Sequence, residues 1–182
     1  MDDTKELVVV VDEHDNAIGL APKLDAHRTG VLHRAFSVMV VDSHGRLLLQ
    51  RRAFEKYHSG GRWANTCCGH PRAGESVVEA AERRLTEEMG ISCTLMPATS
   101  FIYRADVGAG LIEHELDHLL IGRFDGDPHP ATEEVVEWRW WSLDEVTRDL
   151  GAHPDAYAAW FPAALEAFAA RRSSDGAREL PR

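Results

Sequence analysis

The stretch from residue 65 to residue 91 reads NTCCGHPRAGESVVEAAERRLTEEMGI and joins two cysteines and a histidine to a segment rich in carboxylates. Ser76 and Glu79 have the spacing of a capping box, in which each residue bonds the backbone N–H of the other. Gly90 is of the residue type that most often ends a helix. The sequence therefore predicts a helix between these boundaries, directly after a thiol and an imidazole.

The predicted helix has one apolar stripe and one charged flank. Residues of the stripe recur at helical spacing, so the stripe must face the core. Arg84 and Glu88 stand four positions apart beside it, and both side chains can reach a cleft next to the core. The stripe consists of Val78, Ala81, Leu85 and Met89.

The rest of the chain mixes strand and helix patterns. A second capping box at Ser142 and Glu145 predicts a short helix ending near Gly151, and 155–171 looks helical with an interruption at Pro162. Strands are predicted at 8–11, 35–41, 47–50, 116–124 and 135–141, the second and third joined as a hairpin through 42–45. This mixture predicts an α/β fold.

Composition favours one compact domain spanning 1–182, with its core at about 6–170 and flexible residues at the N-terminus and at 171–182. A formal net charge of −10 argues against nucleic acid as a partner, although a local cluster of cations can still hold a small anion. The acidic start and the absence of a long apolar run in the sequence predict a cytoplasmic protein without a membrane partner. Three cysteines give no disulfide framework.

The spacing within the opening stretch resembles the Nudix signature at every position except Arg84, where that signature has Glu. The matching positions are Gly69, Glu75, Arg83, Glu87, Glu88 and Gly90. Nudix enzymes act on diphosphates and hold divalent cations on helix carboxylates. Arginine removes metal-binding charge and adds a forked donor suited to phosphate. The substitution therefore suggests a chain that binds a diphosphate without cleaving it.

A more specific resemblance comes from Cys-Gly-His-Pro at 68–71, from 32–37 upstream and from 113–115 downstream. Together these motifs resemble the type 1 isopentenyl-diphosphate isomerase family, over roughly residues 6 to 170. That family interconverts isopentenyl and dimethylallyl diphosphate by protonation and deprotonation, in isoprenoid biosynthesis, with bound metal and no flavin or nicotinamide. The resemblance implies a Nudix-like α/β/α sandwich, in which a curved mixed sheet lies between helices.

The resemblance implies four catalytic residues. Glu115, assisted by Tyr103, would protonate the substrate, and Cys68 would remove a proton on the opposite face. Trp160 would lie over the cationic carbon, which an aromatic face can stabilise without trapping it. Tyr103 and Trp160 could equally be core aromatics. Strand alternation puts Cys67 on the opposite face from Cys68, and the isolated Cys93 is expected to be an inert apolar residue.

Two carboxylates and three histidines form the implied metal site. Glu113 and Glu115 alternate along an extended segment and so face the same side, where they need a cation or a shared proton. The resemblance adds His27, His33 and His70. Mixed nitrogen and oxygen donors suit Mg²⁺, Mn²⁺ or Zn²⁺ without deciding among them. Ordinary roles are expected for His14, His44, His58, His114, His118, His129 and His153.

The resemblance assigns a set of basic residues to the substrate diphosphate: Lys23, Arg52, Lys56 and Arg84. Glu88 would hold a Mg²⁺ that also touches phosphate oxygens. Charged residues often only solvate a surface, which is the alternative for these cations.

These sequence motifs allow three functions. The isomerase acting on an allylic or homoallylic diphosphate is favoured, as a monomer or a weak homodimer. A Nudix diphosphohydrolase is the enzyme alternative, which Arg84 opposes. A binding module with a structural metal is the third, which the thiol beside His70 opposes.

Overall fold

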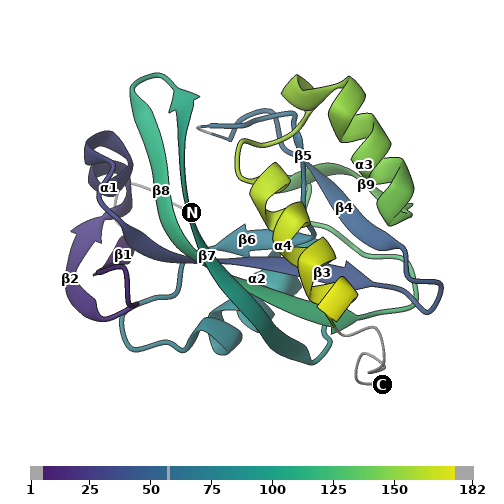
Figure 1. Cartoon of the computed structure of the whole chain (residues 1–182), viewed down its shortest axis with the longest axis horizontal. Helices are drawn as coiled ribbons and strands as arrows, with labels where there is room; N and C mark the ends of the chain where they lie inside the picture. Colours follow the sequence, from purple (N-terminus) through teal and green to yellow (C-terminus); the bar gives the residue numbers. More distant parts are fainter. Residues whose placement is uncertain (1–5, 57, 175–182) are drawn as a thin grey trace.

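A strongly bent mixed sheet runs through the molecule and carries helices on both faces (Figure 1). The structure is a computed structural model that describes residues 6–56 and 58–174. Its strands are β1 (Leu7–Val11), β2 (Ala17–Pro22), β3 (His33–Val41), β4 (Leu47–Arg52), β5 (Trp63–Ala64), β6 (Cys67–Gly69), β7 (Leu95–Gly108), β8 (Leu111–Arg123) and β9 (Val135–Trp141). Its helices are α1 (Lys23–Thr29), α2 (Val77–Met89), α3 (Leu143–Ala152), the 3₁₀ turn η1 (Pro154–Ala156) and α4 (Phe161–Ser174).

Strand β3 is the centre of the sheet. It pairs antiparallel with β1, β4 and β6 and parallel with β8, so the sheet is mixed as predicted. The parallel pairing begins with His33 opposite Glu115. The antiparallel pairing with β6 sets Ser37 opposite Cys68. One strand therefore brings a histidine, a carboxylate and a thiol from distant parts of the sequence to the same region.

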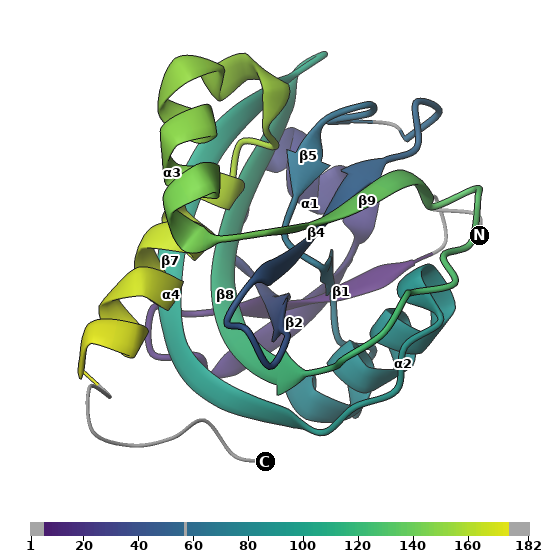
Figure 2. The same ribbon diagram turned by 90° about the vertical axis from the view of Figure 1, so that its right-hand side faces the viewer.

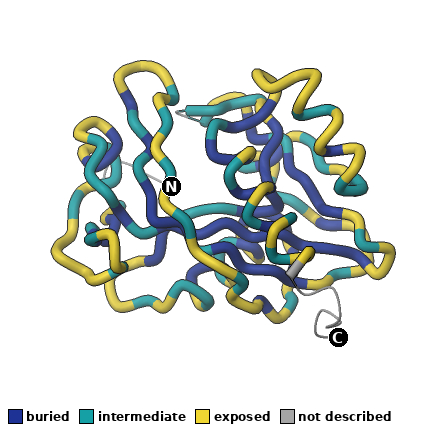
Figure 3. Tube along the Cα trace, viewed as in Figure 1, coloured by how far each residue is buried: buried dark blue, intermediate teal, exposed yellow. Residues whose placement is uncertain are grey.

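Alternating residues of β3 enter two separate apolar layers. Phe36 and Val38 pack in the layer under α2, whereas Met39 and Val41 pack in the layer under α4. Figure 2 shows α2 and α4 on opposite sides of the strands, and Figure 3 shows the buried residues concentrated in the strands between them. A strand covered on both faces reads as a nearly continuous apolar run. The predicted α/β/α arrangement is confirmed.

Helix α2 has both predicted boundaries. The Ser76 hydroxyl accepts a hydrogen bond from the Glu79 backbone N–H at 3.3 Å, and the Glu79 carboxylate accepts one from the Ser76 N–H at 3.0 Å. Gly90 ends the helix at φ 64°, and a Cβ atom there would lie 2.5 Å from the backbone oxygen of His129. Only glycine satisfies both the left-handed backbone and this close approach.

The prediction of a helix over 155–171 with an interruption at Pro162 was wrong about where the helix begins. The segment contains the turn η1, and α4 begins only at Phe161. Pro162 therefore lies in the first helical turn, where its missing N–H has no intrahelical partner to lose. Helix α4 continues to Ser174, and residues 1–5 and 175–182 of the predicted flexible ends lie outside the described residues. Within the described part of the chain, no helix is long and apolar enough to cross a membrane.

Candidate active site

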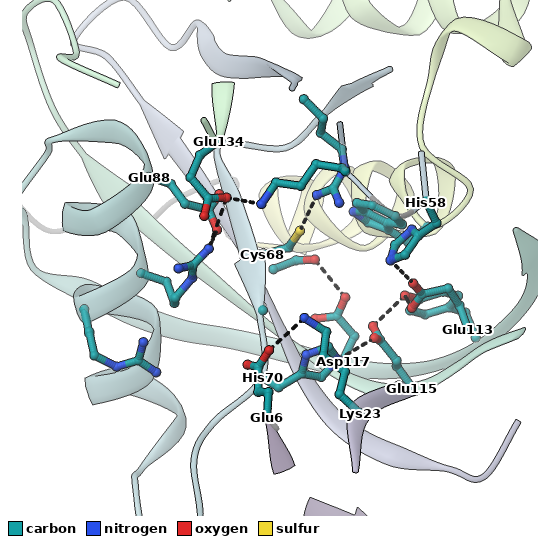
Figure 4. A pocket seen from close by; sticks show the side chains of 18 residues that line it. Glu6, Lys23, His58, Cys68, His70, Glu88, Glu113, Glu115, Asp117 and Glu134 are labelled. Carbon is teal, nitrogen blue, oxygen red and sulfur yellow. Dashed lines mark hydrogen bonds and ion pairs between the residues drawn. The ribbon is translucent and has the colours of Figure 1, made fainter. Parts of the chain in front are cut away.

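One cleft gathers most of the residues nominated from the sequence (Figure 4). They come from α1, α2, β4, β6, β7 and β8 and from segments that connect these elements. The nominated residues that line the cleft are Lys23, Arg52, Lys56, Cys68, His70, Arg84, Glu88, Tyr103, Glu113, Glu115 and Trp160. The other two, His27 and His33, are fully buried beside it.

Backbone carbonyls fix two of the three nominated histidines. His27 Nδ1 lies 2.7 Å from the carbonyl of Lys23, and His33 Nδ1 lies 2.9 Å from that of Val31. A carbonyl only accepts, so each Nδ1 must carry the hydrogen and each Nε2 keeps a lone pair. The ring centroids of His33 and His70 are 5.0 Å apart, as are those of His27 and His33. Three imidazoles therefore converge on one point.

The two carboxylates of β8 face these nitrogens. Glu115 Oε1 lies 2.9 Å from His70 Nε2 and 3.4 Å from His33 Nε2, and Glu113 Oε1 lies 3.5 Å from His27 Nε2. His33 Nε2 is buried and has no hydrogen-bond partner among the described residues. When two donor atoms each lie about 2.1 Å from one cation and form a right angle at it, the two atoms are about 3 Å apart. The donor set therefore fits a divalent cation.

His58 belongs to the same region, although the sequence pattern assigned it an ordinary role. Its Nε2 lies 3.1 Å from Glu113 Oε1, and its side chain is only 7% exposed. Burial lowers the pKa of His58 to about 3, despite the nearby Glu113 charge, so its imidazole is neutral. No motif of the family resemblance covers this loop position, and the sequence carried no signal for it.

Cys67 and Cys68 point to opposite sides of β6, as alternation predicted. Cys67 is fully buried in the layer under α2, whereas Cys68 lines the cleft with its Sγ 3.8 Å from an Arg52 guanidinium nitrogen. Burial raises the pKa of Cys68 to about 12, which Arg52 only partly offsets. Cys68 is therefore a protonated thiol at neutral pH.

Tyr103 connects the two carboxylates. Its hydroxyl donates to Glu115 Oε2 at 2.5 Å and lies 3.1 Å from Glu113 Oε2. Burial acts to raise the pKa of Glu115, but the adjacent His33 and the hydrogen bond from Tyr103 outweigh it and lower the value to about 2. Burial and the adjacent Glu115 charge raise the pKa of Tyr103 well above its usual value. Tyr103 therefore holds a proton and Glu115 does not.

Trp160 is held with one face toward the cleft. Its indole N–H donates to Asn65 Oδ1 at 2.9 Å, and the Arg52 guanidinium carbon lies 5.0 Å from its ring centroid. Arg52 Nε is buried and has no hydrogen-bond partner in the described parts of the chain. That nitrogen is suited to bind an anion entering the cleft.

The other nominated cations are paired with carboxylates. Lys23 Nζ lies 2.9 Å from Glu6 Oε2, and Arg84 contacts Glu88 closely. Glu134, which the sequence analysis missed, contacts Lys56 and lies 3.4 Å from Arg84. Burial disfavours the charge of Arg84, but the neighbouring carboxylates outweigh burial and raise its pKa. Each of these three cations thus lies beside a carboxylate at the cleft.

Asp117 is a second residue that the sequence analysis missed. It is 1% exposed, lines the cleft and accepts a hydrogen bond from the Ser37 hydroxyl at 2.7 Å. Burial, and then the Glu115 charge, raise its pKa well above the usual value. The period-two pattern of Glu113 and Glu115 continues to Asp117, so strand alternation was the signal that could have found it.

The chain is similar to known proteins over most of its length. The NUDIX domain model matches residues 31–162. The chain is 51% identical to "Isopentenyl-diphosphate Delta-isomerase 2" of Aromatoleum aromaticum, over 95% of this chain and 92% of that protein. It is 50% identical to the "Isopentenyl-diphosphate Delta-isomerase" of Nocardia farcinica, over 93% of this chain and 98% of that one.

Solved structures show the same fold at low sequence identity. A Deinococcus radiodurans protein superposes with a TM-score of 0.75 at 19% identity, covering 88% of this chain and 98% of that chain. A MutT NUDIX hydrolase of Burkholderia pseudomallei gives a TM-score of 0.59 at 22% identity, covering 74% of this chain and 96% of that chain.

Proposed function

Because the chain belongs to the isopentenyl-diphosphate Delta-isomerase family of NUDIX-domain proteins, we propose that its cleft transfers protons between two opposed groups, Cys68 and Glu115. The reaction interconverts isopentenyl diphosphate and dimethylallyl diphosphate by moving one double bond. One observation carries the assignment. A thiol and a carboxylate that accepts a hydrogen bond from a tyrosine line a single cleft, together with basic side chains.

The forward step needs an acid and a base at the same time. An unactivated alkene is a weak base, so the acid must be held against it in a pocket that excludes water. Glu115, supplied with a proton through Tyr103, donates to the terminal methylene and leaves a tertiary carbocation. Cys68, as the thiolate, then takes a proton from the adjacent carbon, and that C–H electron pair forms the new double bond.

In each forward turnover Glu115 gives one proton to the substrate and Cys68 takes a different one from it. The resulting state, with a protonated Cys68 and an ionised Glu115, is the one that the raised pKa of Cys68 and the lowered pKa of Glu115 favour. The next forward turnover therefore requires that the proton return to Glu115, and this reset allows exchange with solvent. In the reverse direction Cys68 is the acid and Glu115 is the base.

Trp160 stabilises the carbocation between these two groups. An aromatic face attracts a cation electrostatically and forms no bond to it. The hydrogen bond from its indole N–H to Asn65 keeps the ring in one orientation. Replacing the ring by a carboxylate would offer a nucleophile that could trap the cation.

The diphosphate binds to basic residues that line the cleft, Lys23, Arg52, Lys56 and Arg84. Glu88 would hold a Mg²⁺, which would supply positive charge for the diphosphate. The ion pair between Arg84 and Glu88 holds both side chains at the cleft, where Arg84 would contact the diphosphate and Glu88 the Mg²⁺.

The residues of the second cation site are His27, His33, His70, Glu113 and Glu115, and Mn²⁺, Mg²⁺ or Zn²⁺ suits this mixed donor set. A bound cation supplies positive charge that holds the two carboxylates together and strengthens Glu115 as an acid. The protein itself orients the imidazoles and keeps Tyr103 on Glu115. The cytoplasmic location and the monomeric or weakly dimeric state stay predictions.

One assay separates this function from hydrolysis. Isopentenyl diphosphate is incubated with the protein and Mg²⁺, and both dimethylallyl diphosphate and released phosphate are followed. The proposal expects dimethylallyl diphosphate without phosphate release. Phosphate or a monophosphate as the product would replace the isomerase by a diphosphohydrolase, and no change in the substrate would leave a binding protein.

A further inference from the structure

We infer that Glu134 is a positioning residue for the diphosphate, because its carboxylate holds Lys56 and Arg84 together at the cleft. Glu134 Oε2 contacts Lys56 Nζ closely and lies 3.4 Å from a terminal nitrogen of Arg84. All three side chains line the cleft. This inference rests on the proposed function and adds a residue that the two-base mechanism does not use.

The two cations that Glu134 contacts come from separate elements of the fold. Arg84 lies in α2, whereas Lys56 lies in the segment between β4 and β5. Each has a long side chain, and ordering such a side chain costs conformational entropy. A carboxylate that both cations contact restricts them before the substrate arrives. Less entropy is therefore lost when the diphosphate binds.

The backbone of Glu134 is fixed on both sides. Its carbonyl accepts a hydrogen bond from the Ala53 N–H at 2.9 Å, and its own N–H donates to the Ala131 carbonyl at 3.0 Å. The Ala131 N–H in turn donates to the carbonyl of Glu88, in α2, at 3.0 Å. Glu134 therefore connects α2 to the segment after β4, and these are the two elements that carry the cations.

The carboxylate of Glu134 is charged and mostly enclosed, with a side chain that is 17% exposed. Burial acts to raise its pKa, but the hydrogen bond from Lys56 and the charge of Arg84 outweigh burial and lower the pKa. Glu88 contacts the same Arg84 nitrogen, so the two carboxylates flank it (Figure 4). Because Glu88 would hold the Mg²⁺, Glu134 is the carboxylate that stays beside the cations when substrate is bound.

Both cations can contact Glu134 and a phosphate at the same time. An ammonium has three N–H donors and a guanidinium has five, so one carboxylate oxygen uses only part of either set. The diphosphate is chemically unchanged by the isomerisation, so these contacts bind the substrate and the transition state about equally. Weakening them should therefore raise KM and leave kcat nearly unchanged.

The alternative is that the negative charge of Glu134 repels the diphosphate. Two substitutions separate these roles. Glu134→Ala removes the charge and both acceptor oxygens, whereas Glu134→Gln removes the charge and keeps one oxygen that can accept from a cation. Glu133→Ala is the matched control, because Glu133 is the neighbouring carboxylate, is exposed, and gives the same change in net charge.

The experiment uses the full chain at saturating Mg²⁺. It measures KM and kcat for isopentenyl diphosphate and the inhibition constant of inorganic diphosphate. We expect KM and the inhibition constant to rise about 10-fold in Glu134→Ala and about 3-fold in Glu134→Gln, with kcat within about 2-fold of the parent. Glu133→Ala should match the parent. Circular dichroism establishes that each variant is folded, and Glu134→Gln carries the test if the alanine variant unfolds.

A double-mutant cycle tests whether Glu134 acts through Lys56. If it does, Glu134→Ala should raise KM less when Lys56 is already alanine than in the parent, because the group that it positions is gone. The same rise in both backgrounds would show that Glu134 acts independently of Lys56 and would overturn the inference.

The other contrary results are distinguishable from one another. A lower KM in both Glu134 variants would make the carboxylate a source of repulsion. A lower kcat with an unchanged KM would reduce its role to keeping the protein folded. Recovery of the parent KM in Glu134→Ala when Mg²⁺ is raised further would make it a ligand of that ion. A parent that neither isomerises the substrate nor binds inorganic diphosphate would instead overturn the proposed function.

Discussion

Replacing Arg84 by alanine should weaken diphosphate binding without giving the protein a hydrolase activity. Arg84 lines the cleft, and its guanidinium lies 2.8 Å from Glu87 and 3.4 Å from Glu134 and also contacts Glu88. If the same fork binds a phosphate oxygen, its removal costs one charge-assisted hydrogen bond, about 1.5 to 3 kcal/mol. At about 1.36 kcal/mol per tenfold change, the KM should rise by about 10- to 160-fold.

The same substitution should also change stability in a metal-dependent way. Glu88 is 4% exposed, and without Arg84 it keeps the hydrogen bond from Gln50 at 3.1 Å. A buried acceptor that loses a partner costs about 1 to 3 kcal/mol of unfolding free energy. Adding Mg²⁺ should recover part of this loss, because the cation takes the place of the guanidinium beside Glu88.

Steady-state kinetics and urea unfolding, each with and without Mg²⁺, measure these effects. Arg139→Ala is the control, since Arg139 is exposed and pairs with Glu137 away from the cleft. An unchanged KM in Arg84→Ala would refute the diphosphate contact. Arg84→Glu restores the carboxylate of the Nudix signature and should abolish substrate binding by repulsion. If it instead released phosphate from nucleoside diphosphate compounds faster than the parent, the protein would be a degenerate hydrolase.

Four further substitutions test the site and its surroundings. Cys68→Ala should abolish isomerisation, whereas Cys67→Ala should keep much of it and lose about 1 kcal/mol of stability on denaturant titration; the opposite pattern of activity would reassign the thiol. Glu113→Gln should lower the metal content found by elemental analysis after gel filtration, and full metal content would contradict its role as a ligand. Hydrogen bonds from Arg83 lower the pKa of Glu75 from 4.5 to about 2, so this carboxylate stabilises the fold above pH 4.5 and loses that contribution as the pH falls toward 2. Glu75→Gln should flatten the stability curve between these pH values, and an unchanged slope there would count against the pair.

Local patterns in the sequence were sufficient for the capped helix α2 and for the opposite faces of Cys67 and Cys68. Both depend on fixed periods, 3.6 residues in a helix and 2 in a strand. Strand β7 escaped prediction because most of its residues are exposed or only partly buried, so its long pairing with β8 has no strong apolar pattern in the sequence.

Local sequence patterns could not predict which residues come together in the site, for a different reason. His33 meets Glu115 only because β3 and β8 pair in parallel, and that contact joins residues far apart in the chain. The family motifs supplied this information indirectly. His58 and Glu134 lie in loops outside those motifs, and their positions depend on turn geometry that periodicity does not encode.

Deuterium incorporation tests the two-base account most directly. Isopentenyl diphosphate is converted in heavy water, and the dimethylallyl diphosphate is examined by NMR and mass spectrometry. Because Glu115 donates a proton that has exchanged with solvent and Cys68 removes a different one, deuterium should appear in the methyl group formed from the terminal methylene. Prolonged equilibration should also label the carbon that Cys68 deprotonates. Complete isomerisation with no deuterium in the product would contradict proton transfer by two opposed groups and require an internal hydrogen shift.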